Sequence, residues 1–452
     1  MATAVNNENK LDASYSGLLR VAIPVSLGAF VQFIVAFTDN YFVAALDGNS
    51  MSAVSFVGLI YITLMMMSIG LSNASQIFIA RRKGENRNTE VGAILSNAMI
   101  MGLVIAFAQF LLMRFGLSYA LPWLASSSDV QLKMLEFSDL RSYGFFFFTL
   151  TIVLNSFWAG IATTRVMIYT TLITALFNIV LDYLLVFGNY GFPKMGIEGA
   201  ALATVISEAS AFVFLFIYTL RHRLSKVYHV GHELIRLHVE HTWEIFRLAL
   251  PIMFQLLISL GAWVAFYSIT SVLGDKQFQA SFIVRNMYML VYVSVGGMST
   301  TIKTYVSGLI AEGRQHELKA VIGRTILLNL LGIILLSHGL WLYPEWIASR
   351  FSSDAETILH TVNTMAIVLP AMFVFAASSV LLGAVEGSGN ADRGFYIELI
   401  TIVVYLLAVY FMVYEWNWEI QYVWTADYIY FIFISGLSLL YLGKGSWKYK
   451  KI

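Results

Sequence analysis

The sequence predicts an all-α polytopic membrane protein, and three observations lead to that prediction. The chain has 452 residues, of which 58% are hydrophobic and only 12% charged, whereas soluble domains carry roughly 25% charged residues. Its apolar residues form stretches as long as the roughly 20 residues that cross a bilayer as a helix. Most polar residues fall in short segments between these stretches. Such a pattern is typical of helices whose apolar sides face lipid.

The apolar stretches predict about twelve transmembrane helices. Their approximate ranges are 18–45, 51–79, 91–113, 134–160, 165–188, 196–220, 244–273, 278–309, 321–346, 358–386, 394–414 and 421–442. The longest polar segment lies between the sixth and seventh spans. We therefore expect an N-terminal tail (1–17), an N-lobe (18–220), an inter-lobe linker (221–243), a C-lobe (244–442) and a basic C-terminal tail (443–452). The first apolar stretch is too long for the core of a cleaved signal peptide.

Lysine and arginine predict the orientation. If the N-terminus is cytoplasmic, basic residues are enriched in nearly every cytoplasmic segment, as in "ARRK" at 80–83 and in the linker. Positive charge close to spans marks the cytoplasmic side. An even number of spans then places both termini in the cytoplasm. We expect a multi-pass protein of the plasma membrane, which is the inner membrane in a Gram-negative cell.

The two halves of the chain resemble each other. The segment "RVAIPVSLGAFVQF" at 20–33 aligns with "RLALPIMFQLLISL" at 247–260, so that Pro24 falls on Pro251. Six spans return the chain to the side from which it started. The repeats are therefore expected to be parallel six-helix bundles, related by a pseudo-twofold axis along the membrane normal, with a substrate site near mid-membrane.

Several classes of protein are disfavoured by composition and motifs. A net charge of +1 lacks the basic footprint of a nucleic-acid-binding protein. The absence of cysteine excludes disulfides, thiolate metal sites and a cysteine nucleophile. We find no phosphate-binding P-loop, which argues against direct use of ATP, and no metal motif of an intramembrane transferase. We therefore predict a protein that is not an enzyme and needs no cofactor, with a channel as an alternative.

Two acidic residues inside predicted spans are candidates for ion coupling. Asp39 lies late in the first span, and Asp182 lies in the fifth, four residues after Asn178 on the same helix face. Ionisable groups within spans are costly and usually functional. Two carboxylates in a dry pocket cannot both stay ionised without a cation, so the pair suits H⁺ or, through its hard oxygen atoms, Na⁺. The alternatives are an interfacial Asp39 and a polar pair that only joins two helices.

The sixth span and Pro24 add to this hypothesis. Thr204 follows Ala200 by four residues, so its hydroxyl is expected to face the same site. The small residues of this span could equally serve close helix packing. Pro24 removes one backbone hydrogen bond and should kink the first span. That kink is either fixed or part of a conformational cycle.

A second group of polar and aromatic residues is predicted to contact substrate. These residues are Gln32, Glu208, Gln255, Tyr288, Tyr292, Lys303, Glu398 and Tyr405. Glu208 and Glu398 either bind a cationic substrate or pair with a buried base, for which Lys303 and Arg285 are candidates. Glu386 is expected at the membrane interface. The linker's five histidines favour a solvated amphipathic segment over a metal site.

The stretch "NIVLDYLLVFGNYGFPKMGIEGAALATVISE" at 178–208 resembles the multidrug and toxic compound extrusion (MATE) family, within the multidrug/oligosaccharide-lipid/polysaccharide (MOP) flippase superfamily. Further similarities are "ARRKGE" at 80–85 and "EGSGNADR" at 386–393. The resemblance implies a V-shaped pair of six-helix bundles. It also implies export of organic, often cationic and amphipathic, compounds driven by inward H⁺ or Na⁺.

Within this family the chain is most similar to the DinF-like branch. That resemblance assigns coupling to Asp39, Asn178, Asp182 and Thr204, with Ala200 beside them. The seventh span lacks the acidic residue of NorM-like members, and Phe266 stands where the repeat would place a second Asp39. We therefore predict a monomeric exporter whose partners are a small organic substrate and the bilayer. The alternatives are a flippase for lipid-linked oligosaccharides and, in another class, an intramembrane transferase.

Overall fold

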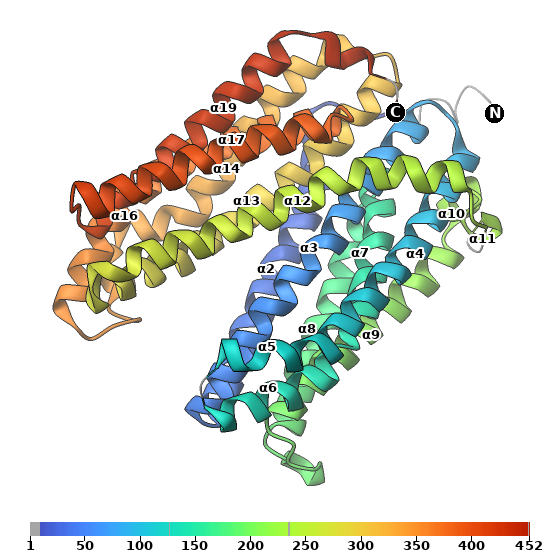
Figure 1. The fold of residues 1–452 in the computed structure, drawn as a ribbon. Coiled ribbons are helices and arrows are strands. Elements are labelled where there is room, and N and C mark those ends of the chain that lie inside the picture. Colours follow the sequence, from blue (N-terminus) through green and yellow to red (C-terminus); the bar gives the residue numbers. More distant parts are fainter. Residues whose placement is uncertain (1–9, 126, 234–235, 451) are drawn as a thin grey trace. The chain divides into compact units, whose positions relative to one another are not determined.

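The computed structural model describes residues 10–125, 127–233, 236–450 and 452, and over these residues it is almost entirely helical, with no strand (Figure 1). The fold-class prediction is confirmed. The chain divides into two compact units. We call residues 27–253 the N-terminal unit. The C-terminal unit combines the chain up to Ser26 with residues 254–452.

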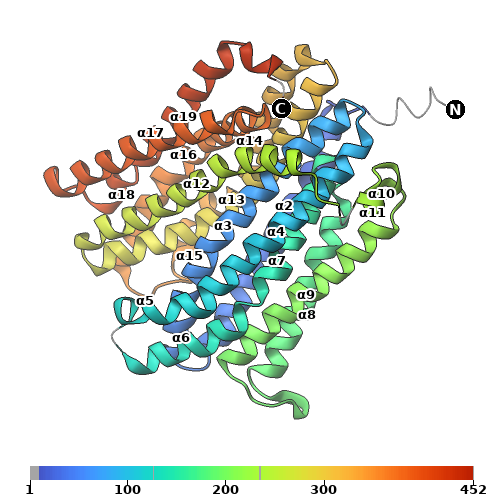
Figure 2. The ribbon, with the colours of Figure 1, turned by 45° about the vertical axis from the view of Figure 1, so that its right-hand side comes forward.

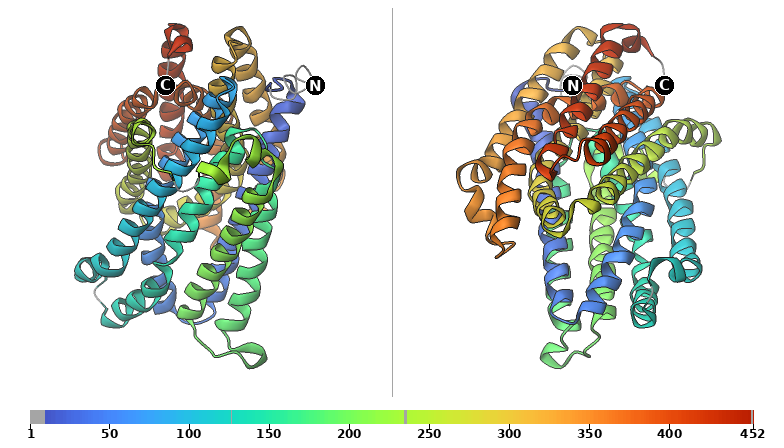
Figure 3. Two further views of the ribbon diagram at one scale, coloured as in Figure 1. Left: turned by 90° about the vertical axis from the view of Figure 1, so that its right-hand side faces the viewer. Right: turned by 60° about the vertical axis from the view of Figure 1, so that its left-hand side comes forward.

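The N-terminal unit contains the larger part of α2 and the helices that follow it. They are α2 (Tyr15–Ala44), α3 (Gly48–Gly84), α4 (Asn88–Leu111), η1 (Leu112–Gly116), α5 (Leu117–Leu124), α6 (Ser128–Arg141), α7 (Gly144–Gly160), α8 (Arg165–Leu185), η2 (Asn189–Gly191), α9 (Ile197–Arg221), α10 (Arg223–Val227), α11 (Val230–Glu233) and the start of α12 (Val239–Thr270). Helices α8 and α9 lie side by side (Figure 2). The loop that joins them, residues 186–196, extends beyond their ends (Figure 3).

The C-terminal unit contains the rest of α12 and all later helices. They are η3 (Ser271–Leu273), α13 (Asp275–Ala311), η4 (Gln315–Glu317), α14 (Leu318–Leu342), α15 (Pro344–Ala348), α16 (Ala355–Gly387), α17 (Ala391–Tyr410), η5 (Phe411–Glu415), α18 (Ile420–Val423), α19 (Ala426–Gly443) and η6 (Ser446–Tyr449). Helix α16 is central, because it packs against α13, α14, α17 and α19.

The predicted spans correspond closely to these helices. Ten described helices are long and apolar enough to cross a membrane, or eleven if one bent pair counts as a single span. The bent pair, α6 and α7, forms the predicted span 134–160, which is broken by 46° rather than straight. The predicted span 278–309 lies within α13, a helix of 37 residues. Helix α13 is not one of the ten helices that are apolar enough to cross a membrane, because polar residues such as Arg285 and Lys303 interrupt its sequence.

The unit boundaries fall at equivalent places in the two sequence repeats. One follows Ser26 in α2 and the other follows Met253 in α12. Each lies two residues after a proline inside the helix, Pro24 or Pro251. A proline lacks the backbone N–H that would bond to the preceding turn, so each helix is weakened where it passes between units.

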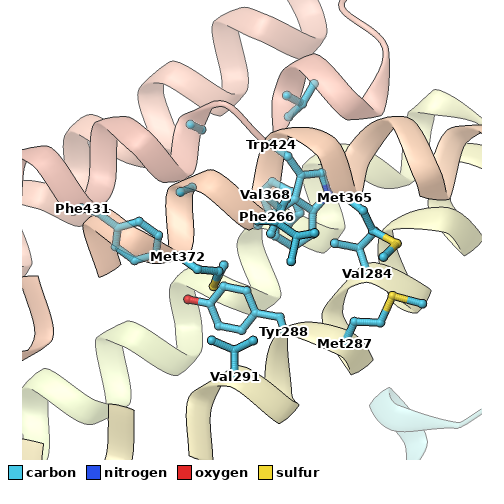
Figure 4. Packing of buried hydrophobic residues seen from close by; sticks show 14 of the residues in the cluster. Phe266, Val284, Met287, Tyr288, Val291, Met365, Val368, Met372, Trp424 and Phe431 are labelled. Carbon is cyan, nitrogen blue, oxygen red and sulfur yellow. The ribbon is translucent and has the colours of Figure 1, made fainter. Parts of the chain in front are cut away.

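Each unit has its own apolar core. In the N-terminal unit, Tyr61, Met134 and Phe145 belong to a buried cluster formed by α3, α6, α7 and neighbouring helices. In the C-terminal unit, the rings of Phe266 and Trp424 pack with methionine and valine side chains (Figure 4). Burial of apolar surface within each bundle therefore holds helices far apart in sequence together.

Candidate functional site

The predicted coupling residues come together in the N-terminal unit. Asn178 and Asp182 lie one turn apart on α8, and both side chains are fully buried. Asp39 of α2 is half-buried, and its carboxyl group interacts with the side chains of both residues. The spacing of four residues on α8 therefore places an amide and a carboxyl group on one face, opposite a second carboxyl group.

The oxygen atoms of this group have few donors. Asp39 Oδ1, Asn178 Oδ1 and both carboxyl oxygens of Asp182 are buried, and none receives a hydrogen bond from the described residues. A buried acceptor without a donor is costly. Two carboxyl groups in contact need a shared proton or a bound cation to relieve their repulsion. The arrangement thus fits H⁺, and its four oxygen atoms also fit Na⁺.

Helix α9 places Thr204 and Ala200 beside Asn178. The amide of Asn178 donates to Thr204 Oγ1 over 3.4 Å, and the Thr204 hydroxyl donates to the carbonyl oxygen of Ala200 over 2.9 Å. Helices α8 and α9 approach closely at Gly199, where a Cβ atom would come within 2.7 Å of the Leu185 carbonyl. Glycine at this position therefore keeps Thr204 within reach of α8.

Glu208 does not pair with either predicted base. Instead, its carboxylate accepts two hydrogen bonds from Arg141, at 3.0 and 2.8 Å. The guanidinium of Arg141 also lies 3.6 Å from the ring centroid of Tyr61. Arg141 ends α6 at the bend of the fourth predicted span, with its side chain 11% exposed. Glu208 is thus one member of a buried bidentate ion pair.

Lys303 pairs with Glu386 in the C-terminal unit, and this corrects two expectations. Its Nζ atom lies 2.7 Å from Glu386 Oε2. Glu386 is only 4% exposed and is therefore not an interfacial residue. Gln255 completes the cluster, because its Nε2 atom donates to Glu386 Oε1 over 2.9 Å. The charge of Lys303 is therefore neutralised locally.

Glu398 is also buried, at 2% exposure, but its contacts are with hydroxyl groups. Ser259 Oγ donates to Glu398 Oε1 over 2.6 Å, and the Tyr430 hydroxyl donates to the same oxygen. The other proposed base, Arg285, lies over the rings of Trp263 and Tyr267, at 5.9 and 5.4 Å. Neither candidate base is found in an ion pair with Glu398.

The remaining predicted residues differ in their surroundings. Gln32 is exposed and Tyr292 is half-exposed, whereas Tyr288 and Tyr405 belong to the packed core of the C-terminal unit. Asp427, which we did not single out, is 6% exposed at the start of α19 and has a buried oxygen without a donor. An acidic residue inside the predicted span 421–442 was the signal that could have found it.

Two of the linker histidines contact one glutamate. The two carboxylate oxygens of Glu233 on α11 lie 3.0 Å from His232 Nδ1 and 3.0 Å from His238 Nε2. These contacts lower the pKa of Glu233 below its ordinary value. Among the described residues, no group of three or more His, Cys, Asp or Glu side chains is placed to hold a metal ion.

Comparisons with known proteins agree with this architecture. The MatE family model matches residues 24–184 and 251–411, which are one segment in each half of the chain. The chain is 24% identical to a probable multidrug resistance protein NorM of Thermotoga maritima, covering 96% of this chain and 93% of that protein. It is 23% identical to a probable multidrug resistance protein YoeA of Bacillus subtilis, covering 76% and 74%.

A solved structure of a MOP superfamily transporter from Pyrococcus furiosus has the same fold, with a TM-score of 0.88, 18% identity and 96% coverage of both chains. The Vibrio cholerae MATE transporter VcmN is equally similar in fold, with a TM-score of 0.88 and 14% identity over 96% of this chain and 98% of that one. The matched segments cover most of both repeats, and the helices form a multi-pass membrane protein. The chain therefore belongs to the MatE family of transporters.

Proposed function

We propose that this protein is a secondary active exporter of organic, amphipathic or cationic compounds, driven by inward flow of H⁺ or Na⁺. Coupling takes place at Asp39, Asn178, Asp182, Thr204 and Ala200. The observation that carries the proposal is the interaction between the carboxyl groups of Asp39 and Asp182, of whose oxygen atoms three are buried and lack donors. Binding of one cation stabilises this pair, and its release restores the repulsion. Alternating access then links that change to movement of substrate.

Two further observations support export of organic compounds, and the second of them bears on cations. The relatives from T. maritima and B. subtilis are named as probable multidrug resistance proteins. Lys303, the base that could repel a cationic substrate, is neutralised by Glu386. The proposal includes the plasma membrane as location and cytoplasmic termini. Within the family, the DinF-like branch stays a prediction.

The test is transport by purified protein in liposomes, with ethidium as a fluorescent amphipathic cation. A pH gradient and a Na⁺ gradient are imposed separately, which identifies the coupling ion. We expect Asp182→Asn to abolish ion-driven ethidium transport, because the neutral amide cannot exchange a cation. Asp129→Asn, which changes an exposed carboxylate of the same unit, serves as the matched control and should transport normally. Full ion-driven transport by Asp182→Asn would exclude the assigned site.

A further inference from the structure

The C-terminal unit contains a buried carboxylate without a basic partner. Glu398 is held by the hydroxyl groups of Ser259 and Tyr430, which are both neutral. The candidate base Lys303 already forms an ion pair with Glu386 at 2.7 Å. Within the part of the chain that the structure describes, none of the ion pairs includes Glu398. If Glu398 is ionised, its charge therefore stays uncompensated.

An unpartnered acceptor lies one helical turn away. Gln255 is 6% exposed, and its Oε1 atom is buried and receives no hydrogen bond from the described residues. A Cβ atom on Gly394 would approach that oxygen to 3.4 Å. Gly394 precedes Glu398 by one turn on α17, and Gln255 precedes Ser259 by one turn on α12. The facing surfaces of α12 and α17 therefore combine a carboxylate with an acceptor that lacks a donor.

Charge and packing define what this site can bind. Lys303, Glu386 and Glu398 carry a formal net charge of −1 when all three are ionised, so one monovalent cation would neutralise them. Uncompensated charge inside a membrane is costly. Packing is tight, because a Cβ atom on Gly394 would come within 3.2 Å of Glu386 Cγ. A proton needs no added volume, whereas an organic cation would have to displace side chains.

We propose that Glu398 is a second proton-binding site, separate from the pair Asp39–Asp182. A proton from water adds to the carboxylate of Glu398 and removes its charge. The Ser259 hydroxyl can then turn fully to the main-chain carbonyl oxygen of Gln255, which lies 2.9 Å away. For its role in transport, this inference rests on the proposed ion-driven export. Proton binding itself is independent of any substrate.

The other titratable groups around Glu398 are fixed in different ways. Glu386 from α16 is paired with Lys303 from α13. The Tyr430 hydroxyl of α19 donates a hydrogen bond to Glu398, and the phenol of Tyr292 on α13 is close enough to be affected by the charge of Glu398. Phenol groups ordinarily lose their protons only near pH 10. Buried Asp427 of α19 lies within the same unit. It must therefore be distinguished from Glu398 in any measurement of proton binding.

The experiment is infrared difference spectroscopy of the purified full chain, recorded as pH is raised. The C=O stretch of protonated carboxylic acids reports each buried acid as it loses its proton. We expect Glu398→Gln to remove one such band and to leave the band removed by Asp182→Asn unchanged. Asp427→Asn should leave the Glu398 band in place. Glu415→Gln, an exposed glutamate close to the end of α17, is the matched control and should change no buried band.

Each outcome has a defined meaning. Loss of the Glu398 band without loss of the Asp182 band supports the second site even if Asp182→Asn transports normally. A spectrum of Glu398→Gln identical to that of the wild type would overturn the proposal. Displacement of the Glu398 band by NaCl but not by choline chloride would also overturn it, in favour of a Na⁺ site. If Glu398→Gln does not fold, Tyr430→Phe provides the test, because loss of that hydrogen bond must shift the same band.

Discussion

Replacement of Glu208 by glutamine tests how much the buried ion pair contributes to the N-terminal unit. The change keeps the shape of the side chain but leaves the Arg141 guanidinium without a counter-charge. The two side chains are only 11% and 13% exposed and share two hydrogen bonds. Removal of one partner from a buried pair typically costs about 3–5 kcal/mol. We expect a loss of unfolding free energy of about that size for Glu208→Gln.

The assay is unfolding in detergent micelles, followed by tryptophan fluorescence. Trp158 is a suitable reporter, because it is fully buried in the same unit and donates to Thr219 Oγ1 over 3.0 Å. Asp139→Asn is the matched control. Its ion pair with Arg114 is a third to two-fifths exposed, so the change should cost about 0–1 kcal/mol. An equal loss of stability in the two variants would refute the reasoning.

Three other changes should have measurable effects. Gly144→Ala should destabilise the N-terminal unit by roughly 1–3 kcal/mol in the same assay, because its Cβ atom would lie 2.0 Å from Arg141 Nη1. Lys303→Met should cost about 3–5 kcal/mol through the unpaired Glu386, and the addition of Glu386→Gln should recover most of that loss. Since the pKa of Glu233 is lowered in the folded protein, its contribution to stability is present above the ordinary glutamate pKa and is lost as pH falls through the folded value. Melting temperatures measured from pH 7 downwards should therefore decrease less steeply at acid pH in Glu233→Gln than in the wild type.

The sequence was sufficient to predict contacts that depend on local spacing. Asn178 and Asp182 share a face because a helix repeats every 3.6 residues, and an apolar run of that length in a membrane must be helical. The number of spans followed from the same rule. The span at 278–309, which corresponds to α13, was predicted from the length of its apolar stretch, although polar residues lower the mean hydropathy of that helix. These features need no knowledge of which helices are neighbours.

Contacts between distant segments could not be predicted in this way. Arg141 lies near the start of the predicted span 134–160, and nothing in the local sequence indicates which residue its side chain meets. Its partner Glu208 is 67 residues later in the sequence. Glu386 was placed at the interface because it is near the end of its helix, whereas α13 brings Lys303 to it. Sequence spacing gives the face of a helix but not the helix that it meets.

The two units distribute buried charge according to the same pattern. Each has a buried glutamate within a helix bundle that is paired with a base, Glu208 with Arg141 and Glu386 with Lys303. Each also has acidic groups without a base: Asp39 and Asp182 interact with each other, and Glu398 contacts the hydroxyl groups of Ser259 and Tyr430. A glutamate with a fixed counter-charge has little tendency to take up a proton, because protonation would leave the base unpaired. Proton exchange is then confined to the acids without a base.

This pattern changes what the repeat means for coupling. Phe266 stands at the position equivalent to Asp39 and is fully buried among aromatic rings, so the C-terminal unit cannot reproduce the Asp39–Asp182 pair. One of its buried acids without a basic partner, Glu398, lies instead on α17. If both units bind protons, a transport cycle can move two protons per exported molecule. Glu398→Gln should then halve the proton-to-ethidium ratio, measured from the pH gradient that just balances an opposing ethidium gradient. An unchanged ratio would mean that Glu398 takes no part in coupling.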